Sequence, residues 1–157
     1  MLDGGDMIVG LYNLPTVKVN NKIKLKRAFV GDKEIILKFV EEHFQKNWIY
    51  EVEHSLMQDV SKCFLATHNG KLIGFACYDA SAKGFFGPIG VDPDYRMENI
   101  GKALLIRTLS AMKEYGYGYA IIGWVSEAEM FYRKTVDAEY IKDGNPENSV
   151  YSNLVSM

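Results

Sequence analysis

The stretch VDPDYRMENIGKALL, residues 91–105, joins a polar loop to the start of an amphipathic helix. At such a junction the first amides of the helix have no partner within it, and the helix dipole adds positive potential, so together they favour a bound anion. Arg96 and Lys102 add positive charge on either side of the turn. Spacing alone leaves two interpretations open, a phosphate site and a simple helix cap with a polar loop.

The centre of this stretch holds Asn99, two residues before Gly101, where a glycine would be usual. Asparagine is, after glycine, the residue that adopts φ > 0 most readily, because its short polar side chain tolerates the left-handed region. We therefore expect a left-handed turn at Asn99. Gly101 keeps the position at which the backbone would approach a phosphate.

The chain on both sides of the loop predicts alternating strands and helices. Residues 23–30 alternate as a half-buried strand does, and residues 100–115 carry the apolar stripe of a helix. From residue 23 onward the predicted elements are a strand at 23–30, a helix after Asp32, a helix over 48–58, a hairpin over 60–80 with its turn at Asn69-Gly70, an irregular strand at 84–91, a helix over 100–115, a strand at 119–125, a helix through 130–134, and two last strands within 138–141 and 149–157. This order, βααβββαβαββ, predicts an α/β fold with a mixed sheet.

The length of 157 residues fits one domain and is too short for two. We expect a single domain over residues 1–157. Residues 1–22 would form an N-terminal extension that adds a strand at the apolar run MIVGLY, residues 7–12.

Composition limits the partners and the location of the protein. The formal net charge is −2 and no run of Lys or Arg resembles a nucleic-acid arm, so we expect no nucleic-acid partner. No apolar stretch reaches the roughly 20 residues that cross a bilayer, and the N-terminus lacks the basic flank of a signal segment, so we expect no membrane contact and a cytoplasmic location. His43, His54 and His68 lack metal-ligand spacing, so we expect no metal.

The two cysteines, Cys63 and Cys77, flank the predicted Asn-Gly turn. A two-residue turn would put Cys63 opposite Ala76 and Cys77 opposite Lys62, with the thiols on opposite faces of the sheet. We therefore expect two reduced cysteines without a disulfide.

The opening stretch matches the loop pattern V-x-P-x-x-[RQ]-x-x-G-x-[GA]-x-x-L at Val91, Pro93, Arg96, Gly101 and Leu104. It thereby resembles the GNAT superfamily of acyl-CoA-dependent N-acyltransferases, with asparagine in place of the first glycine. The segment FYRKTVDAEYI, residues 131–141, is similar to the FYxKxGFxxx segment that follows the family's fifth strand. The family's order of elements is also similar from residue 23 to the end, so the resemblance covers most of the chain.

The resemblance implies a single-domain fold with a mixed central sheet of about six to seven strands, about four flanking helices and splayed strands at the acyl-CoA site. It also implies acetyl-CoA as cosubstrate, without a metal. The residues that would bind it are the strand positions Ile89, Gly90 and Val91 along the pantetheine arm, and Arg96, Met97, Glu98, Asn99, Ile100, Gly101 and Lys102 around the pyrophosphate.

Acyl transfer from a thioester to an amine needs a neutral amine, stabilisation of the oxyanion and a proton for the departing thiolate. The resemblance implies that Tyr132 is the general acid that protonates the sulfur, and that a backbone N–H near Val91 stabilises the oxyanion. It also implies that the helix with WIY, residues 48–50, forms a wall of the acceptor site. Candidates for the general base remain open: Glu51, Glu53, His54, Asp79 and Glu127.

The sequence therefore predicts an N-acetyltransferase that moves the acetyl group of acetyl-CoA to a primary amine of a small molecule or peptide. Attack would be direct, because neither cysteine lies in the setting of a nucleophile. A non-catalytic acyl-CoA-binding regulatory module and an α/β protein that binds another nucleotide remain alternatives. The acceptor amine and a homodimer both stay open.

Overall fold

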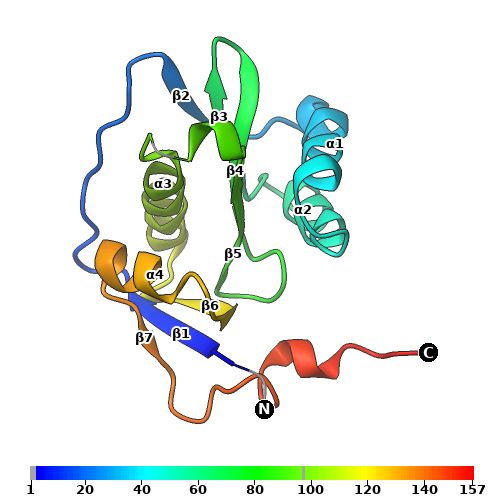
Figure 1. Cartoon of the computed structure of the whole chain (residues 1–157), viewed down its shortest axis with the longest axis vertical. Helices are drawn as coiled ribbons and strands as arrows, with labels where there is room; N and C mark the ends of the chain where they lie inside the picture. The colour runs from blue at the N-terminus through cyan, green and yellow to red at the C-terminus, as the bar shows by residue number, and fades with distance from the viewer. Residues whose placement is uncertain (1–2, 97) are drawn as a thin grey trace.

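A seven-stranded mixed sheet runs through the part of the chain that the computed structural model describes, residues 3–96 and 98–157 (Figure 1). Its strand order is β2-β3-β4-β5-β6-β1-β7, in which β5 and β6 pair in parallel and the other neighbours are antiparallel. The strands are β1 (Gly5–Gly10), β2 (Ile23–Arg27), β3 (Cys63–His68), β4 (Lys71–Tyr78), β5 (Phe85–Val91), β6 (Tyr119–Val125) and β7 (Glu139–Tyr140).

Four α-helices cover the two faces of this sheet in the described residues. Figure 1 shows α1 and α2 on one side and α3 and α4 on the other. Their bounds are α1 (Lys33–His43), α2 (Trp48–Leu56), α3 (Ile100–Tyr115) and α4 (Glu129–Val136), with short 3-10 helices η1 (Val30–Asp32), η2 (Pro93–Tyr95) and η3 (Val150–Asn153). The predicted α/β class with a mixed sheet is confirmed. No helix in the described ranges combines the length and apolar character needed to cross a membrane.

Each face of the sheet has its own apolar core. Toward α3 and α4, Phe64, Leu104 and Ile122 belong to one buried cluster. Toward α1 and α2, Ile36 and Phe75 belong to the other. The apolar stripes of the amphipathic helices thus cover both faces of the sheet, which fixes the position of its central strands.

The N-terminal segment contributes an inner strand next to the β7 edge of the sheet. Strand β1 lies between β6 and β7, with Val9 opposite Ala120 and Ile8 opposite Glu139. Met7 and Val9 are fully buried in the core on the α3 side. The apolar run at residues 7–12 therefore contributes residues 7–10 to β1, because one face of this strand is covered by the core.

The prediction of two strands at the end of the chain was wrong in part. Strand β7 is only two residues long, and residues 149–157 form no strand but turn into η3. The edge of β6 is already paired with β1, so no edge beside β6 is left for a last strand. Instead, the Ser149 hydroxyl donates to the Asp6 carboxylate at 3.0 Å and anchors η3 beside β1.

The predicted register of the β3–β4 hairpin was also wrong. The turn itself has the expected left-handed residues, Asn69 at φ 51° and Gly70 at φ 80°. The register shifts at a bulge between Ala66 and Thr67, so Cys63 lies opposite Cys77 and both thiols face α1 and α2. Both cysteines are free and buried.

Candidate active site

Strands β5 and β6 pair only through the first two residues of β5 and the middle of β6. The parallel ladder joins Phe85 to Ile121 and Phe86 to Ile122 and then stops, although both strands continue. Just beyond it, Gly87 has φ +114°. We call the segments after the ladder, Gly87–Val91 and Gly123–Val125, the β5–β6 split. This is the splaying of strands that the resemblance implies.

Peptide groups of β5 alternate between β4 and the split. The Asp92 amide donates to the Ile73 carbonyl of β4 at 2.7 Å, so the peptide groups of Gly90 also face β4 and those of Ile89 and Val91 face the split. The Val91 carbonyl accepts from Arg96 Nε at 3.3 Å, which agrees with this alternation. Ile89 and Val91 therefore have peptide groups aimed at the split.

The structure gives Gly90 a packing role, and its predicted place along the pantetheine arm stays a prediction. Its peptide groups lie in the ladder with β4, opposite Phe75. A Cβ at position 90 would lie 2.5 Å from the ring of Phe44, which packs on the α1 and α2 face. The ring of Phe44 thus explains why position 90 is a glycine, because any side chain at this position would clash with the ring.

The start of α3 has the predicted left-handed turn. Asn99 has φ 60° and ψ 16° and precedes the first helical residue, Ile100. The first helical bond runs from the Ala103 amide to the Asn99 carbonyl at 3.0 Å. The amides of Ile100, Gly101 and Lys102 precede it and have no acceptor within the helix. The side chain of Ile100 is fully buried, which fixes the helix start against the core.

No neighbour in the described residues requires a glycine at position 101. A Cβ there would lie 3.7 Å from the Phe131 ring and 3.8 Å from Val91, which are ordinary contacts. The space beside Gly101 is thus compatible with an anion held close to the backbone. Arg96, Glu98 and Lys102 are exposed around this turn. The predicted role of Met97 falls outside the described residues.

Tyr132 of α4 packs beside the split. Its side chain is 6% exposed, and its ring lies edge-on to Phe86, the last β5 residue of the ladder, at 6.3 Å between centroids. Within residues 3–96 and 98–157 the Tyr132 hydroxyl has no hydrogen-bond partner. Burial raises the pKa of this phenol well above its ordinary value, so it stays protonated at neutral pH.

The opposite face of the split carries an aromatic wall. Phe44 stacks on Trp48 at 5.4 Å, and both rings meet Phe75 of β4 edge-on. The predicted segment at residues 48–50 contributes Trp48 and Ile49 to this packing, whereas Tyr50 is exposed. The wall is thus apolar and lies beside Gly90.

The five predicted base candidates have different surroundings. Glu53 pairs with Lys33 at 3.0 Å, and His54 Nδ1 lies 2.8 Å from the Ala80 carbonyl. Asp79 is buried and pairs with Lys62 at 2.8 Å. Glu127 is exposed. In the described chain, no cluster of three or more His, Cys, Asp or Glu side chains could hold a metal ion.

Glu51 belongs to a hydrogen-bonded chain that the sequence did not predict. The Tyr151 hydroxyl donates to Ser81 Oγ at 2.9 Å, and Ser81 Oγ donates to Glu51 Oε1 at 2.7 Å. Glu51 is 30 residues from Ser81, and Ser81 is 70 residues from Tyr151. No local spacing pattern in the sequence links residues so far apart. In addition, the sequence predicted a strand at residues 149–157, so it did not indicate that Tyr151 would reach Ser81.

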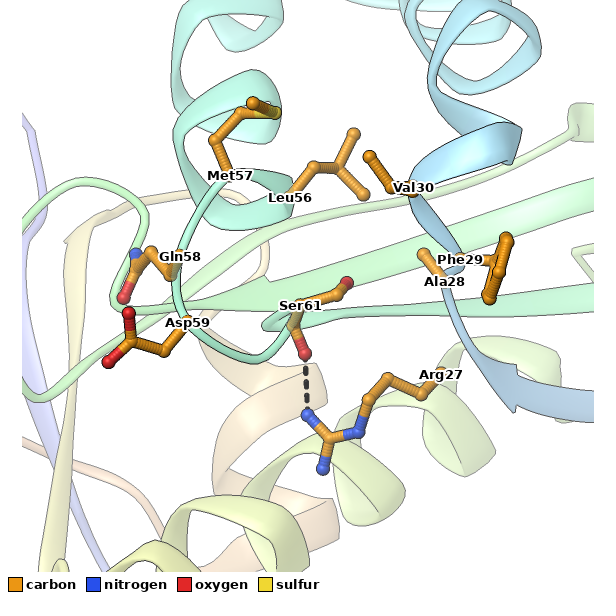
Figure 2. Close-up of a pocket in the computed structure, with 9 residues that line it drawn as sticks. All are labelled: Arg27, Ala28, Phe29, Val30, Leu56, Met57, Gln58, Asp59 and Ser61. Atoms are coloured by element: carbon orange, nitrogen blue, oxygen red, sulfur yellow. Dashed lines mark hydrogen bonds between the residues drawn. The ribbon is translucent and has the colours of Figure 1, made fainter.

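Two surface hollows lie away from the split. Figure 2 shows the smaller, of about 330 Å³, where Arg27 donates to the Ser61 carbonyl at 2.6 Å beside Phe29 and Leu56. The larger, of about 620 Å³, adjoins it and includes Lys62 and Tyr115. Neither hollow includes a residue of β5, β6 or α4. Their position does not connect them with the chemistry of the split.

Solved structures share this fold at low sequence identity. A GCN5-related glucosamine N-acetyltransferase region of a fungal multi-domain GH3 β-N-acetylglucosaminidase has a TM-score of 0.67 at 16% identity, over 87% of this chain and 19% of that one. A GCN5-related N-acetyltransferase from Sphaerobacter thermophilus has a TM-score of 0.67 at 21% identity, over 83% of this chain and 46% of that one. A Mycobacterium tuberculosis protein in complex with CoA has a TM-score of 0.54 at 20% identity, over 71% of this chain and 69% of that one.

This chain spans less than half the length of the first two structures. No curated protein sequence matches it. The sequence model of the Acetyltransferase (GNAT) family matches residues 31–135, which is more than half of the chain and includes the β5–β6 split, the start of α3 and Tyr132. The chain therefore belongs to the acetyltransferase (GNAT) family.

Proposed function

We propose that the protein transfers the acetyl group of acetyl-CoA directly to a primary amine of a small molecule or peptide. The observation that carries this proposal is that three features lie along β5, with the Tyr132 phenol near its start at Phe86 and the other two toward its end at Val91. These are peptide groups at Ile89 and Val91 that face the split, the free helix start at Gly101, and the buried phenol of Tyr132. Together they match the needs of a thioester with a phosphate-bearing arm.

The pyrophosphate of acetyl-CoA would lie at the start of α3. The amides of Ile100, Gly101 and Lys102 point toward the helix N-terminus, and the exposed side chains of Arg96 and Lys102 add positive charge. The missing side chain at Gly101 supports this position, because a phosphate can then approach the backbone closely, and a Cβ there would make only ordinary contacts with Phe131 and Val91. Ile89 and Val91 would pair with the pantetheine amides as an added strand does. The assignment of Gly90 to this arm is supported only through its neighbours in β5.

Tyr132 would supply the proton that the departing thiolate takes. Burial raises the pKa of the Tyr132 phenol and so keeps its proton in place. The same burial disfavours a charged thiolate, so the thiolate would readily accept a hydrogen bond and then the proton from this phenol. The amine lone pair would form the C–N bond, the C–S bond would break with its electron pair on sulfur, and sulfur would take the Tyr132 proton. The Val91 amide, which faces the split, would donate to the carbonyl oxygen.

The side chains on the α1 and α2 face of the sheet indicate which kind of acceptor amine would fit. The wall of Phe44 and Trp48 is apolar, and the Glu51 carboxylate lies on the same side of the sheet. A small molecule with one primary amine and an apolar or sugar body fits such a surface. One similar solved structure is a region described as a glucosamine N-acetyltransferase, which makes amino sugars a first choice for screening.

The test is release of coenzyme A in a panel of primary amines, followed with a thiol reagent. The proposal predicts amine-dependent release that saturates in both substrates. The alternative of a regulatory acyl-CoA-binding module predicts a thermal shift with acetyl-CoA but no release above background with any amine. That second outcome would contradict the proposed transfer.

A further inference from the structure

Three polar side chains from distant parts of the chain form one directional hydrogen-bonded chain on the acceptor side of the sheet. Tyr151 comes from η3, Ser81 from the loop between β4 and β5, and Glu51 from α2. Each hydroxyl donates toward the carboxylate, from Tyr151 to Ser81 at 2.9 Å and from Ser81 to Glu51 at 2.7 Å. Because a hydroxyl can accept one proton while it donates another, this order is that of a proton path that ends on Glu51.

The Tyr151 end of this path lies at the β5–β6 split. A Cβ at Gly123, the first β6 residue after the ladder, would lie 3.0 Å from the Tyr151 hydroxyl oxygen. The Tyr151 ring also lies edge-on to Phe85 of β5 at 6.4 Å. The phenol oxygen therefore adjoins the position where β5 and β6 separate, on the face opposite to Tyr132.

The other end of the path is open to proton exchange. Glu51, Ser81 and Tyr151 are all half-buried, so none is sealed in the core. Burial raises the pKa of the Glu51 carboxyl, although its hydrogen bond from Ser81 acts in the opposite direction. Burial also raises the pKa of Tyr151 to about 12, so the phenol stays protonated between turnovers. A carboxylate whose pKa moves toward neutrality is a stronger proton acceptor than an exposed one.

Contacts of the Asp6 carboxylate hold the segment that carries Tyr151. The Asp6 carboxylate accepts from the Ser149 hydroxyl at 3.0 Å and from the Trp124 amide at 2.8 Å, and so joins η3 to the split. Asp6 is also the other charged group that faces Tyr151. On α2 the titratable residue at i+3 spacing from Glu51 is His54, whose Nδ1 lies 2.8 Å from the Ala80 carbonyl, and Glu53 pairs with Lys33.

We propose that Tyr151, Ser81 and Glu51 form a proton relay that removes the proton from the acceptor amine, with Tyr151 in contact with the amine and Glu51 as the final acceptor. This inference rests on the proposed acetyl transfer and adds the base that the transfer lacks. It assigns catalytic contact to Tyr151 and positioning and relay roles to Ser81 and Glu51.

The relay conserves atoms and charge. As the amine nitrogen bonds to the acetyl carbon, its proton passes to the Tyr151 oxygen, the Tyr151 proton passes to Ser81 Oγ, and the Ser81 proton passes to the Glu51 carboxylate. On the other face, the C–S bond breaks and sulfur takes the proton of Tyr132. Solvent then removes the proton from half-exposed Glu51 and returns one to Tyr132, which resets both sides.

The experiment is coenzyme A release against pH for the full chain and the variants Glu51→Gln, Ser81→Ala and Tyr151→Phe. Each variant should lower kcat by about 10² or more, the usual contribution of general base catalysis, while KM for acetyl-CoA stays within a few-fold. In the wild type, kcat should fall as pH drops through the raised pKa of Glu51. Glu51→Gln should lose this acidic limb, and Ser81→Thr, which keeps the hydroxyl, should restore most of the rate.

Matched controls are Glu114→Gln at the exposed end of α3 and Tyr119→Phe at the exposed start of β6. They should leave the rate and the pH profile unchanged. Thermal melting with acetyl-CoA checks that each relay variant is folded. Variants that keep wild-type rate and profile overturn the relay alone. A wild type that releases no coenzyme A with any amine overturns both the relay and the proposed transfer.

Discussion

The hydroxyl oxygen of Tyr151 lies so close to Gly123 that a Cβ on that glycine would be 3.0 Å from it and nearer still to the ring. This contact joins η3, near the end of the chain, to the strand that opens beside the candidate acetyl site. It explains a glycine inside a strand, where glycine otherwise weakens pairing. It also sets the position of the phenol on which the proposed proton relay depends.

Substitution of Gly123 tests this contact. Gly123→Ala should destabilise the protein by about 1–3 kcal/mol through overpacking and should lower turnover, because Tyr151 must move. Urea unfolding gives the first quantity and coenzyme A release the second. Gly10→Ala is the matched strand control, because a Cβ there makes an ordinary contact of 3.5 Å with Tyr12. In a Tyr151→Ala background the cost of Gly123→Ala should largely disappear, and a cost that persists would contradict the contact.

We predict that Asn99 serves only the turn before α3, whereas Gly101 serves acetyl-CoA binding. Asn99→Gly should leave acetyl-CoA affinity within about threefold, because glycine also adopts the φ of 60° and the Asn99 side chain makes no capping hydrogen bond. Gly101→Val should weaken binding at least about 100-fold, because its branched side chain would occupy the space proposed for the phosphate. Isothermal titration with acetyl-CoA measures both. The reverse ranking would refute the division.

Glu51→Gln should make the protein more stable at neutral pH while it lowers activity. Burial raises the folded-state pKa of Glu51, so protonation favours the folded state, and this stabilisation is lost as pH rises from the unfolded value of 4.5 through the raised folded value. Glutamine is never ionised and avoids that loss. Melting temperatures measured from pH 4 to pH 8 should therefore diverge as pH rises, with the variant higher. Parallel curves would show that Glu51 is not destabilised by burial.

The buried pair of Lys62 and Asp79 supports the loop that carries Ser81. Their side chains lie 2.8 Å apart, and Asp79 also accepts from the Tyr117 hydroxyl and from the Gly84 amide. Lys62→Met should cost about 3–5 kcal/mol, because it leaves a buried carboxylate without its partner. Adding Asp79→Asn should recover part of that loss. Chemical denaturation of the single and double variants checks this, and equal losses would contradict a coupled pair.

The same pair should be insensitive to pH over the physiological range. Burial alone would lower the pKa of Lys62, but the hydrogen bonds and charges of Asp79 and Tyr115 together outweigh burial and raise this pKa. The contribution is therefore complete below the unfolded value of 10.5 and is lost only as pH rises through the folded value. The stability deficit of Lys62→Met should accordingly stay constant from about pH 6 to 9.

The left-handed residues at the ends of α3 and α4 could be predicted, because this backbone conformation depends on residue type. The left-handed turn at Asn99 follows from the short side chain of asparagine, and Asp137 adopts φ 56° at the end of α4, where the family pattern has glycine. The strands and helices before residue 138 were also predicted, because their apolar periods are set by the two faces of one sheet.

The remaining features depend on tertiary contacts that local patterns do not encode. The bulge near Ala66 reversed the predicted facing of Cys63 and Cys77, because a one-residue shift moves a side chain to the other face. The last segment bent into η3 because β1 had already occupied the edge of β6. The chain from Tyr151 to Glu51 could not be predicted, since it unites three elements that the fold alone brings together.

The most direct test of the central claim is single-turnover coenzyme A release by the wild type and by Tyr132→Phe, with saturating acetyl-CoA and an active amine. Phenylalanine keeps the ring that packs on Phe86 and removes only the hydroxyl. The account predicts amine-dependent release by the wild type and a rate at least about 100-fold lower in the variant, with acetyl-CoA affinity unchanged. Equal single-turnover rates would contradict the role of Tyr132 as the proton donor to sulfur.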